Sequence, residues 1–307
     1  MAPIITSEGL TKWYGRSRGI ENVSFTVNEG EIFGFLGPNG AGKTTTIRLL
    51  MGLLRPTGGS ASIGGHDTWT DSVAVKRLVG YLPSDPQLDS DLTGGQLIEY
   101  FTNLRGGVDK KYVQSLVDRF ELDTRKRFRD YSRGNKQKVG IVQAFMHKPK
   151  LLVLDEASSG LDPLNQIEFN KLLMETRTDG RTVFLSSHIL PEVEQVCDRV
   201  AVLNRGVLVA LDSPLALRQM HAERKVDAVL AGGSRCVFDL DRPEERARLG
   251  QHVQAGDVVS VQTREFTFHQ AFLKLTGAPL NDDAPGAAAE RVQPRHWLSR
   301  WFGRRSA

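Results

Sequence analysis

The segment that most constrains the fold is the glycine-rich stretch GPNGAGKT, Gly37 to Thr44, which fits the pattern G-x-x-x-x-G-K-[ST]. The preceding EIFGFL is typical of a short buried strand, and the following TTTIRLLMGLL carries apolar residues at helical spacing. Glycines here let several backbone N–H groups point at one anion, and the helix adds the positive end of its dipole. The sequence therefore predicts a strand, loop and helix that bind the phosphates of a nucleotide.

Individual residues of this loop have distinct expected roles. Lys43 places a positive charge on the β- and γ-phosphates, and the Thr44 hydroxyl can ligate Mg²⁺. The residues expected to contact the nucleotide here are Gly37, Pro38, Asn39, Gly40, Ala41, Gly42, Lys43, Thr44 and Thr45.

Two adjacent acids follow a second apolar run, in KLLVLDEASSGLDP. Leu151 to Leu154 read as a central strand that ends in Asp155 and Glu156. A carboxylate at the C-terminal end of a strand lies where open α/β sheets place their ligands. We expect Asp155 to hold Mg²⁺ through water and Glu156 to act as general base on the attacking water. A plain turn after a strand is the alternative, and the phosphate loop favours the catalytic reading by analogy.

The stretch TVFLSSHIL, Thr182 to Leu190, is another buried-strand pattern, and it ends near His188. A histidine at such a strand end could contact the γ-phosphate and sense its loss. A lone histidine is usually an ordinary surface or core residue, so only its place in this series of motifs selects it.

Composition sets limits on the class of protein. The 307 residues allow one large domain plus a smaller one, and a net charge of +4 does not argue for nucleic acid. Cys197 and Cys236 match no metal or redox spacing, which favours reduced thiols. The N-terminus lacks the apolar core of a signal peptide, and runs such as LLVL are far shorter than the ~20 residues that span a bilayer.

These motifs in this order resemble the nucleotide-binding subunit of an ABC transporter, over roughly residues 4 to 217. The resemblance implies ATP and Mg²⁺ as cofactors, with GPNGAGKTT as the Walker A loop and LLVLDE as the Walker B strand. It also implies that SGLD, ending in Asp162, is the D-loop and that His188 is the switch histidine. Tyr14 would stack on adenine through its π-face, with Trp13 as the competing candidate.

The polar stretch YSRGNKQK falls where this family has its LSGGQ signature. There the resemblance implies a helix whose N-terminus faces the γ-phosphate of ATP bound to the partner subunit. Ser132 and the Gly134 backbone would supply the donors, reinforced by the helix dipole. Tyr131, Arg133 and Asn135 depart from the family's Leu, Gly and Gln, whereas the two phosphate-facing positions are retained.

The implied fold class is α/β, a P-loop NTPase with an ABC-type ATPase core at residues 1–218. It would contain an N-terminal antiparallel β subdomain and an inserted helical subdomain at about residues 86–150. The segment after residue 218 changes periodicity, with KVDAVLAG, RCVFDL and DVVSVQT alternating as strands and PEERARLGQHV and HQAFLKLTG as helical stretches. This pattern predicts a small α+β appendage at residues 219–279.

Residues 280–307 are expected to form a flexible linker and a basic aromatic tail, RHWLSRWFGRRSA. A helix there would place four apolar side chains on one face and supply a basic complement, which suggests contact with an anionic membrane surface. The alternative is a solvated tail, because eleven residues make a marginal helix. The apolar residues are Trp297, Leu298, Trp301 and Phe302, and the basic ones are Arg295, Arg300, Arg304 and Arg305.

Each motif occurs once, so the resemblance implies a second ATP-binding subunit, with a homodimer expected, and an integral membrane permease. It predicts a peripheral location on the cytoplasmic face of the membrane, no nucleic acid, and export of drugs or other small hydrophobic compounds. The alternative is a soluble ABC-type ATPase acting in translation or DNA maintenance. Relatives in DNA maintenance carry long coiled coils between these motifs, and translation relatives usually carry two cassettes per chain.

One departure from the family generates a prediction. In VGYLPSDPQ, the position of the family's Q-loop glutamine is Ser84, whose shorter side chain would reach Mg²⁺ or water only if the loop moved closer; Gln87 is a possible substitute. Replacing Ser84→Gln should leave ATP binding intact and alter turnover. The measurement is the steady-state rate of hydrolysis, and equal rates for variant and wild type would remove Ser84 from the mechanism.

Overall fold

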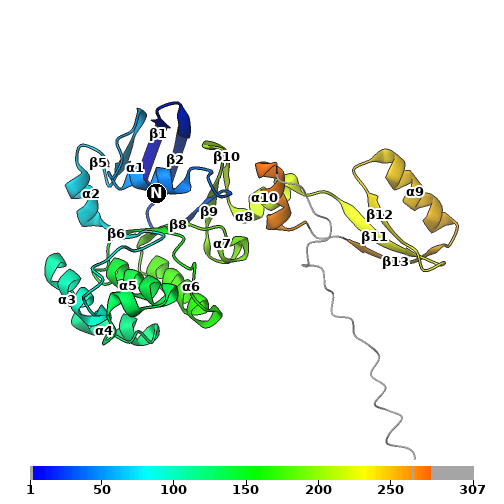
Figure 1. Cartoon of the computed structure of the whole chain (residues 1–307). Coiled ribbons are helices and arrows are strands. Elements are labelled where there is room, and N and C mark those ends of the chain that lie inside the picture. The colour runs from blue at the N-terminus through cyan, green and yellow to red at the C-terminus, as the bar shows by residue number, and fades with distance from the viewer. Residues whose placement is uncertain (1–2, 264–265, 278–307) are drawn as a thin grey trace, which may run out of the picture.

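The computed structural model describes residues 3–263 and 266–277, and its central feature is a six-stranded sheet (Figure 1). The strand order is β10-β9-β3-β8-β7-β6, and all neighbours are parallel except the edge strand β10, which is antiparallel to β9. The strands are β3 (Ile32–Leu36), β6 (Val79–Leu82), β7 (Leu151–Asp155), β8 (Thr182–Ser186), β9 (Arg199–Asn204) and β10 (Val207–Asp212).

Burial explains why these short apolar runs form a parallel sheet. Every residue of β3, β7 and β8 is buried, so both faces of the sheet are covered. Strands buried on both faces read as continuous apolar runs rather than alternating ones, as these do. The α/β fold with a strand before the phosphate loop, predicted from the sequence, is therefore confirmed.

A four-stranded antiparallel sheet, in the order β2-β1-β4-β5, packs on one face of the central sheet. Phe25 of this sheet stacks on Phe33 of β3 and Phe184 of β8, with ring centroids 5.7 and 6.0 Å away. Such aromatic pairs contribute about 0.5–1.5 kcal/mol each beyond the area they bury, so this cluster fixes the two sheets together. The strands are β1 (Pro3–Tyr14), β2 (Ser17–Asn28), β4 (Gly58–Ile63) and β5 (His66–Asp67).

Helices cover the rest of the central sheet, and α3, α4 and α5 gather at one end of it (Figure 1). Thr93 and Gln96 form a reciprocal capping box at the start of α3, as the polar residues before its apolar run favour. The helices are α1 (Lys43–Leu50), α2 (Ser72–Leu78), α3 (Gly94–Arg105), α4 (Lys110–Arg119), η1 (Phe128–Asp130), α5 (Arg133–Phe145), α6 (Pro163–Thr178), α7 (Leu190–Val196) and α8 (Pro214–His221).

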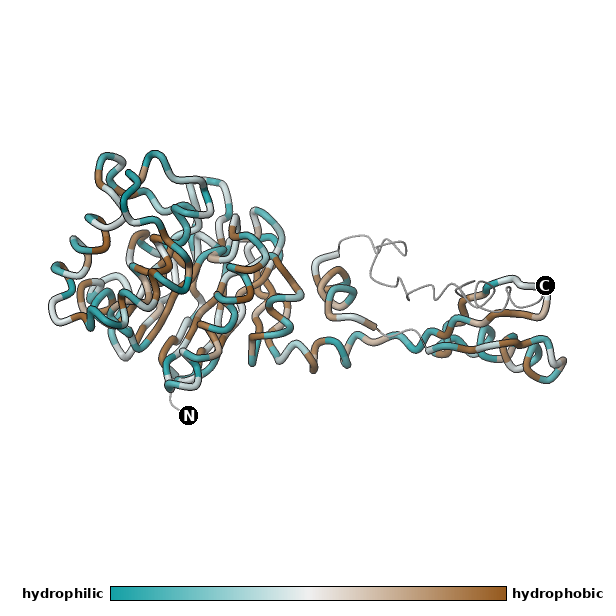
Figure 2. Tube along the Cα trace, turned by 90° about the horizontal axis from the view of Figure 1, so that it is seen from below, coloured by the Kyte–Doolittle hydropathy of each residue, from teal (hydrophilic) through white to brown (hydrophobic). Residues whose placement is uncertain are grey.

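A small three-stranded antiparallel sheet, in the order β12-β11-β13, follows and is set apart from the core (Figures 1 and 2). Its one helix, α9, packs on β12, and Val226, Ala228 and Phe238 are its only fully buried apolar residues among those described. The elements are β11 (Lys225–Leu230), β12 (Arg235–Asp239), α9 (Pro243–Gln254) and β13 (Val258–Thr263).

The final described helix, α10 (Phe268–Thr276), falls within the predicted appendage at residues 219–279, but it packs on the main core. The helix contacts mainly α8, β9 and α7, and Phe268 is fully buried in the main hydrophobic core. The Asn204 side chain also donates a hydrogen bond to the Thr276 carbonyl at 3.0 Å. Amphipathic spacing predicted the helix but could not tell which surface it covers.

Every helix within the described ranges is too short or too polar to cross a lipid bilayer. The predicted linker and basic aromatic tail lie outside the described residues, and so does the hypothesis of tail contact with a membrane.

The packing of α10 generates a stability prediction. Replacing Phe268→Ala should lower the free energy of unfolding by about 3–5 kcal/mol, because it removes a fully buried ring from the main core. The measurement is urea unfolding followed by circular dichroism. Val259→Ala is the control, since that side chain is 68 % exposed and its loss should cost under about 0.5 kcal/mol. A loss below about 1 kcal/mol for Phe268→Ala would contradict the docking of α10 on the core.

Candidate nucleotide-binding site

The phosphate loop runs from β3 into α1 and folds tightly around its lysine. Lys43 is 6 % exposed, and its Nζ donates hydrogen bonds to the carbonyls of Gly37 at 2.7 Å and Pro38 at 3.3 Å. The backbone N–H of Ala41 also donates to the Pro38 carbonyl at 3.1 Å. The loop thus holds the lysine ammonium at the start of the helix, where the dipole favours an anion.

Gly42, the residue before α1, shows why the loop needs glycine. Its φ of +107° lies in a region that favours glycine, and a Cβ atom there would come within 2.5 Å of Ile20 Cγ2. The chain can therefore enter the helix this close to β2 only without a side chain.

The charge on Lys43 is incompletely compensated by the protein. Burial lowers the pKa of this ammonium, and the charges of Glu156 and Asp155 oppose that effect. The Glu156 carboxylate Oε1 is 3.9 Å from Lys43 Nζ, so the ion pair is loose. The remaining partners are neutral carbonyls, and a phosphate oxygen would be a stronger acceptor because charge-assisted hydrogen bonds are about twice as strong.

Thr44 and Asp155 meet at the point where the sequence predicts a magnesium ion. The Thr44 hydroxyl donates to Asp155 Oδ2 at 3.1 Å, and Asp155 Oδ1 is buried with no hydrogen-bond partner among the described residues. Burial raises the pKa of the Asp155 carboxyl, and a nearby cation would oppose that shift. Mg²⁺ commonly uses one or two protein oxygens together with substrate phosphates and water, so this pair fits it.

Ser84 and Gln87 are the two residues that the sequence offers in place of the family's Q-loop glutamine. Ser84, which the sequence places at the metal, makes no hydrogen bond to Thr44 or Asp155 within the part of the chain that the structure describes. The Gln87 amide donates to Asp85 at 2.7 Å and is exposed. A role for Ser84 or Gln87 at the metal stays a prediction.

Glu156 has an unusual backbone conformation. Its φ is +51°, in the left-handed region that a glutamate rarely adopts, and such a conformation costs about 1–3 kcal/mol. The adjacent backbone over-determines it, because the Glu156 N–H donates to the Ser186 carbonyl and the Glu156 carbonyl accepts from the Ser159 N–H. The carboxylate consequently points toward Lys43 and also lies 3.5 Å from His188 Nδ1. The histidine side chain is half exposed.

Tyr14 lies over the start of α1. Its hydroxyl is 3.5 Å from Thr45 Oγ1, and 47 % of the residue is exposed. The Trp13 backbone N–H donates to the hydroxyl of Thr57, the residue before β4, at 3.1 Å. The Tyr14 side chain therefore lies beside Thr45 of α1, and the choice between the two rings for adenine stays a prediction.

Ser132 and Gly134 lie at the N-terminus of α5, and no hydrogen bond within the described residues joins them to the phosphate loop. Ser132 Oγ accepts from the Asn135 N–H at 3.3 Å and caps the helix. A Cβ atom on Gly134 would lie 2.5 Å from the Gly160 carbonyl oxygen, so glycine permits close packing of α5 on the D-loop. This steric reason is independent of any contact with nucleotide.

Asp162 starts α6 and already has partners in its own turn. Its carboxylate accepts from the Asn165 N–H at 3.0 Å and from the Asn165 amide at 2.6 Å, and these bonds lower the pKa of Asp162. In this structure the residue is a helix cap.

Sequence reasoning missed Glu192, a buried carboxylate beside this site. It accepts hydrogen bonds from Ser158 and Ser187, which belong to the segments that follow β7 and β8. The only sequence signal is its position four residues after His188. Its partners are far apart in sequence, so the pairing could not be read locally.

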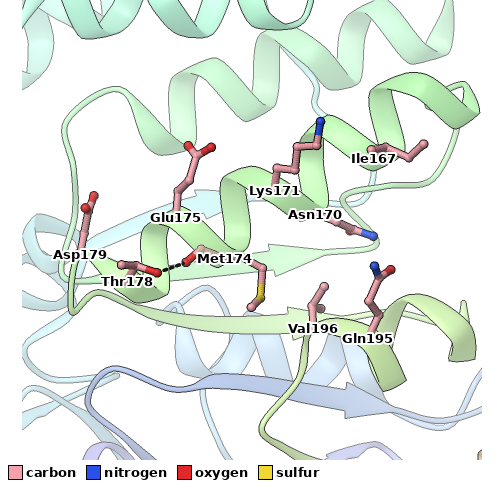
Figure 3. A pocket seen from close by; sticks show the side chains of 9 residues that line it. All are labelled: Ile167, Asn170, Lys171, Met174, Glu175, Thr178, Asp179, Gln195 and Val196. Atoms are coloured by element: carbon pink, nitrogen blue, oxygen red, sulfur yellow. Dashed lines mark hydrogen bonds between the residues drawn. The ribbon is translucent and has the colours of Figure 1, made fainter.

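A separate groove of about 640 Å³ lies between α6 and α7, where Met174 and Val196 face each other and Asn170 lies nearby (Figure 3). None of its lining residues belongs to the predicted nucleotide site.

Three features define a P-loop nucleotide-binding protein: a glycine-rich loop after a parallel strand, a buried lysine, and a hydroxyl that faces a carboxylate at the end of a strand. The family model described as "ABC transporter" matches residues 20–159. The bacitracin transport ATP-binding protein of Bacillus licheniformis is 36 % identical, over 90 % of this chain and 98 % of that protein. The chain therefore belongs to the ATP-binding proteins of ABC transporters, a family of ATPases.

Other relatives agree. The fluoroquinolones export ATP-binding protein of Mycobacterium tuberculosis is 31 % identical, over 90 % of this chain and 94 % of that protein. An uncharacterized ABC transporter ATP-binding protein of Nostoc is 40 % identical over 63 % of this chain, which spans 59 % of that relative's length. A solved ATP-binding subunit of an ABC transporter has a TM-score of 0.66 and 31 % identity, covering 71 % of this chain and 92 % of that one.

The two aromatic candidates can be separated by a matched pair of variants. Tyr14→Ala should weaken ATP binding about 5- to 100-fold, because base stacking on an aromatic ring contributes about 1–3 kcal/mol. Trp13→Ala, the adjacent control, should change the affinity less than about twofold. The measurement is titration calorimetry with ATP and Mg²⁺. Weakened binding by Trp13→Ala with no effect of Tyr14→Ala would reverse the assignment.

Proposed function

We propose that this chain is the ATP-hydrolysing subunit of a bacterial exporter, which powers a separate membrane permease and moves drugs or other small hydrophobic compounds outward. The observation that carries the ATPase part is the convergence of Lys43, Asp155 and Glu156 at one edge of the central sheet. The export part is supported by relatives that are named for bacitracin transport and fluoroquinolone export.

In the proposed reaction, Lys43 and the N-terminus of α1 bind the β- and γ-phosphates. The Glu156 carboxylate accepts a proton from the water that attacks the γ-phosphate, and His188 holds that carboxylate and contacts the same phosphate. Thr44 and Asp155 would hold Mg²⁺, which would supply charge neutralisation on the phosphates. Tyr14 would receive the adenine ring, next to Thr45.

A second subunit is part of the proposal because no hydrogen bond among the described residues joins Ser132 or Gly134 to the phosphate loop of the same chain. Ser132 is exposed at the start of α5, where a helix dipole can act on the nucleotide of another chain. A closed pair of chains would hold two ATP molecules, each between one phosphate loop and the partner subunit's signature. ATP would then stabilise the closed pair, and hydrolysis would remove that preference.

The proposed location is the cytoplasmic face of the membrane, in contact with the permease. The helical region of α3 and α4 offers the surface for this contact, since Tyr100 and Leu104 of α3 are 56 % and 66 % exposed. Exposed large apolar side chains at adjacent turns are suited to a protein partner.

The general base assignment predicts the behaviour of Glu156→Gln. The variant should bind ATP with wild-type affinity but hydrolyse it about 10²- to 10⁴-fold more slowly, because the amide cannot accept the proton. It should accumulate as a dimer with ATP and remain a monomer with ADP, as measured by light scattering. Hydrolysis at the wild-type rate would contradict the assignment.

The same variant tests the transporter proposal. Tagged Glu156→Gln, incubated with detergent-solubilised native membranes and ATP, should retain a membrane protein with several spans in stoichiometric amount, identified by mass spectrometry. The control is the same incubation with ADP. Recovery of only ribosomes, DNA or soluble complexes would overturn the exporter and leave the ATPase assignment standing.

A further inference from the structure

Glu192 is a carboxylate buried where charge is costly. It lies in the first turn of α7, four residues after His188, and is only 6 % exposed. Its Oε1 is buried with no hydrogen-bond partner among the described residues. A buried carboxylate lowers the stability of the fold unless it is well paired. Packing alone therefore does not explain a glutamate at this position.

The other oxygen of this carboxylate joins the two segments that carry the proposed chemistry. Glu192 Oε2 accepts from Ser158 Oγ at 2.8 Å and from Ser187 Oγ at 3.0 Å. Ser158 is two residues after Glu156, and Ser187 directly precedes His188. Ser187 Oγ also accepts from the Ile189 N–H at 3.0 Å, so the backbone on both sides of His188 is held.

The segment after Glu156 is held from its opposite side by α5. The buried Gln137 amide donates to the Ala157 carbonyl at 3.0 Å, and the Arg133 guanidinium donates to Ser159 Oγ at 3.1 Å. Residues 157–159 therefore lie between Glu192 and the helix that begins at Ser132. Hydrogen bonds and residues 157–158 together connect the signature helix with Ser187 and Ile189, the neighbours of His188.

We propose that Glu192 is a positioning residue for ATP hydrolysis: it fixes the backbone of His188 against the segment that follows Glu156. Through that segment it also links the chain's own site to the helix that faces the partner subunit's nucleotide. The inference rests on the proposed function, because it assigns Glu192 to the same reaction. The role assigned to Glu192 requires no contact with substrate or the reacting atoms, and its hydrogen bonds go to Ser158 and Ser187.

The test compares Glu192→Ala with Glu194→Ala in steady-state hydrolysis of ATP. Glu194 is on the same helix, exposed, and loosely paired with Arg218 at 3.8 Å, so it is a matched control. Glu192→Ala should lower kcat about 10- to 100-fold with the KM for ATP changed less than about threefold. Glu192→Gln keeps an acceptor oxygen for both serines and should restore most of the rate.

A double variant separates positioning from a general loss of structure. If Glu192 acts through His188, then in a His188→Ala background the Glu192→Ala change should lower kcat by no more than about threefold. Should Glu192→Ala fail to fold, Ser158→Ala and Ser187→Ala remove one hydroxyl each and should each lower kcat at an unchanged KM.

The possible failures are distinguishable. A wild-type rate in Glu192→Ala, or in both serine variants, overturns the inference while the proposed function stands. An undiminished effect of Glu192→Ala in the His188→Ala background also overturns it. A wild-type chain that does not hydrolyse ATP overturns the proposed function and this inference with it.

Discussion

Parallel pairing of β3, β8 and β7 is the constraint on which the site depends. Phe35 of β3 and Asp155 of β7 both pair with Ser186 of β8, so the three strands end level with one another. The residues that follow them are the phosphate loop, Glu156 and His188, which therefore emerge at one edge of the sheet. Open α/β sheets bind their ligands at this edge, in the crevice outside the carboxyl ends of the strands.

The site combines buried charges, polar atoms and a backbone conformation whose cost in free energy the protein does not fully offset by itself. Lys43 is buried with neutral carbonyls and one loosely placed carboxylate, and one oxygen of the buried Asp155 lacks a hydrogen-bond partner among the residues that the structure describes. Glu156 adopts a backbone conformation that glutamate disfavours. Each feature costs stability, and binding of an anionic phosphate and a cation, as proposed, would relieve or use each of them. Such costs persist at functional sites because the surrounding structure over-determines them.

Contiguous motifs made much of this site predictable. Three segments can each be recognised within about a dozen residues, because each is an apolar run followed by polar residues of defined type. They are the phosphate loop with its preceding strand, the strand that ends at Asp155, and the strand before His188. Pairings between distant segments could not be predicted in this way. The docking of α10 on the core, the two serines on Glu192 and the close contact of Gly134 with Gly160 depend on tertiary packing that one segment does not encode.

The central claim is that Lys43 and the loop around it bind the phosphates of ATP. The most direct measurement is titration calorimetry of ATP with Mg²⁺ against the wild-type chain and Lys43→Ala, with thermal unfolding to show that the variant is folded. The account predicts one ATP per wild-type chain and an affinity about 10- to 100-fold weaker for the variant, because a charge-assisted contact is lost. Equal affinities for the two folded chains would contradict it.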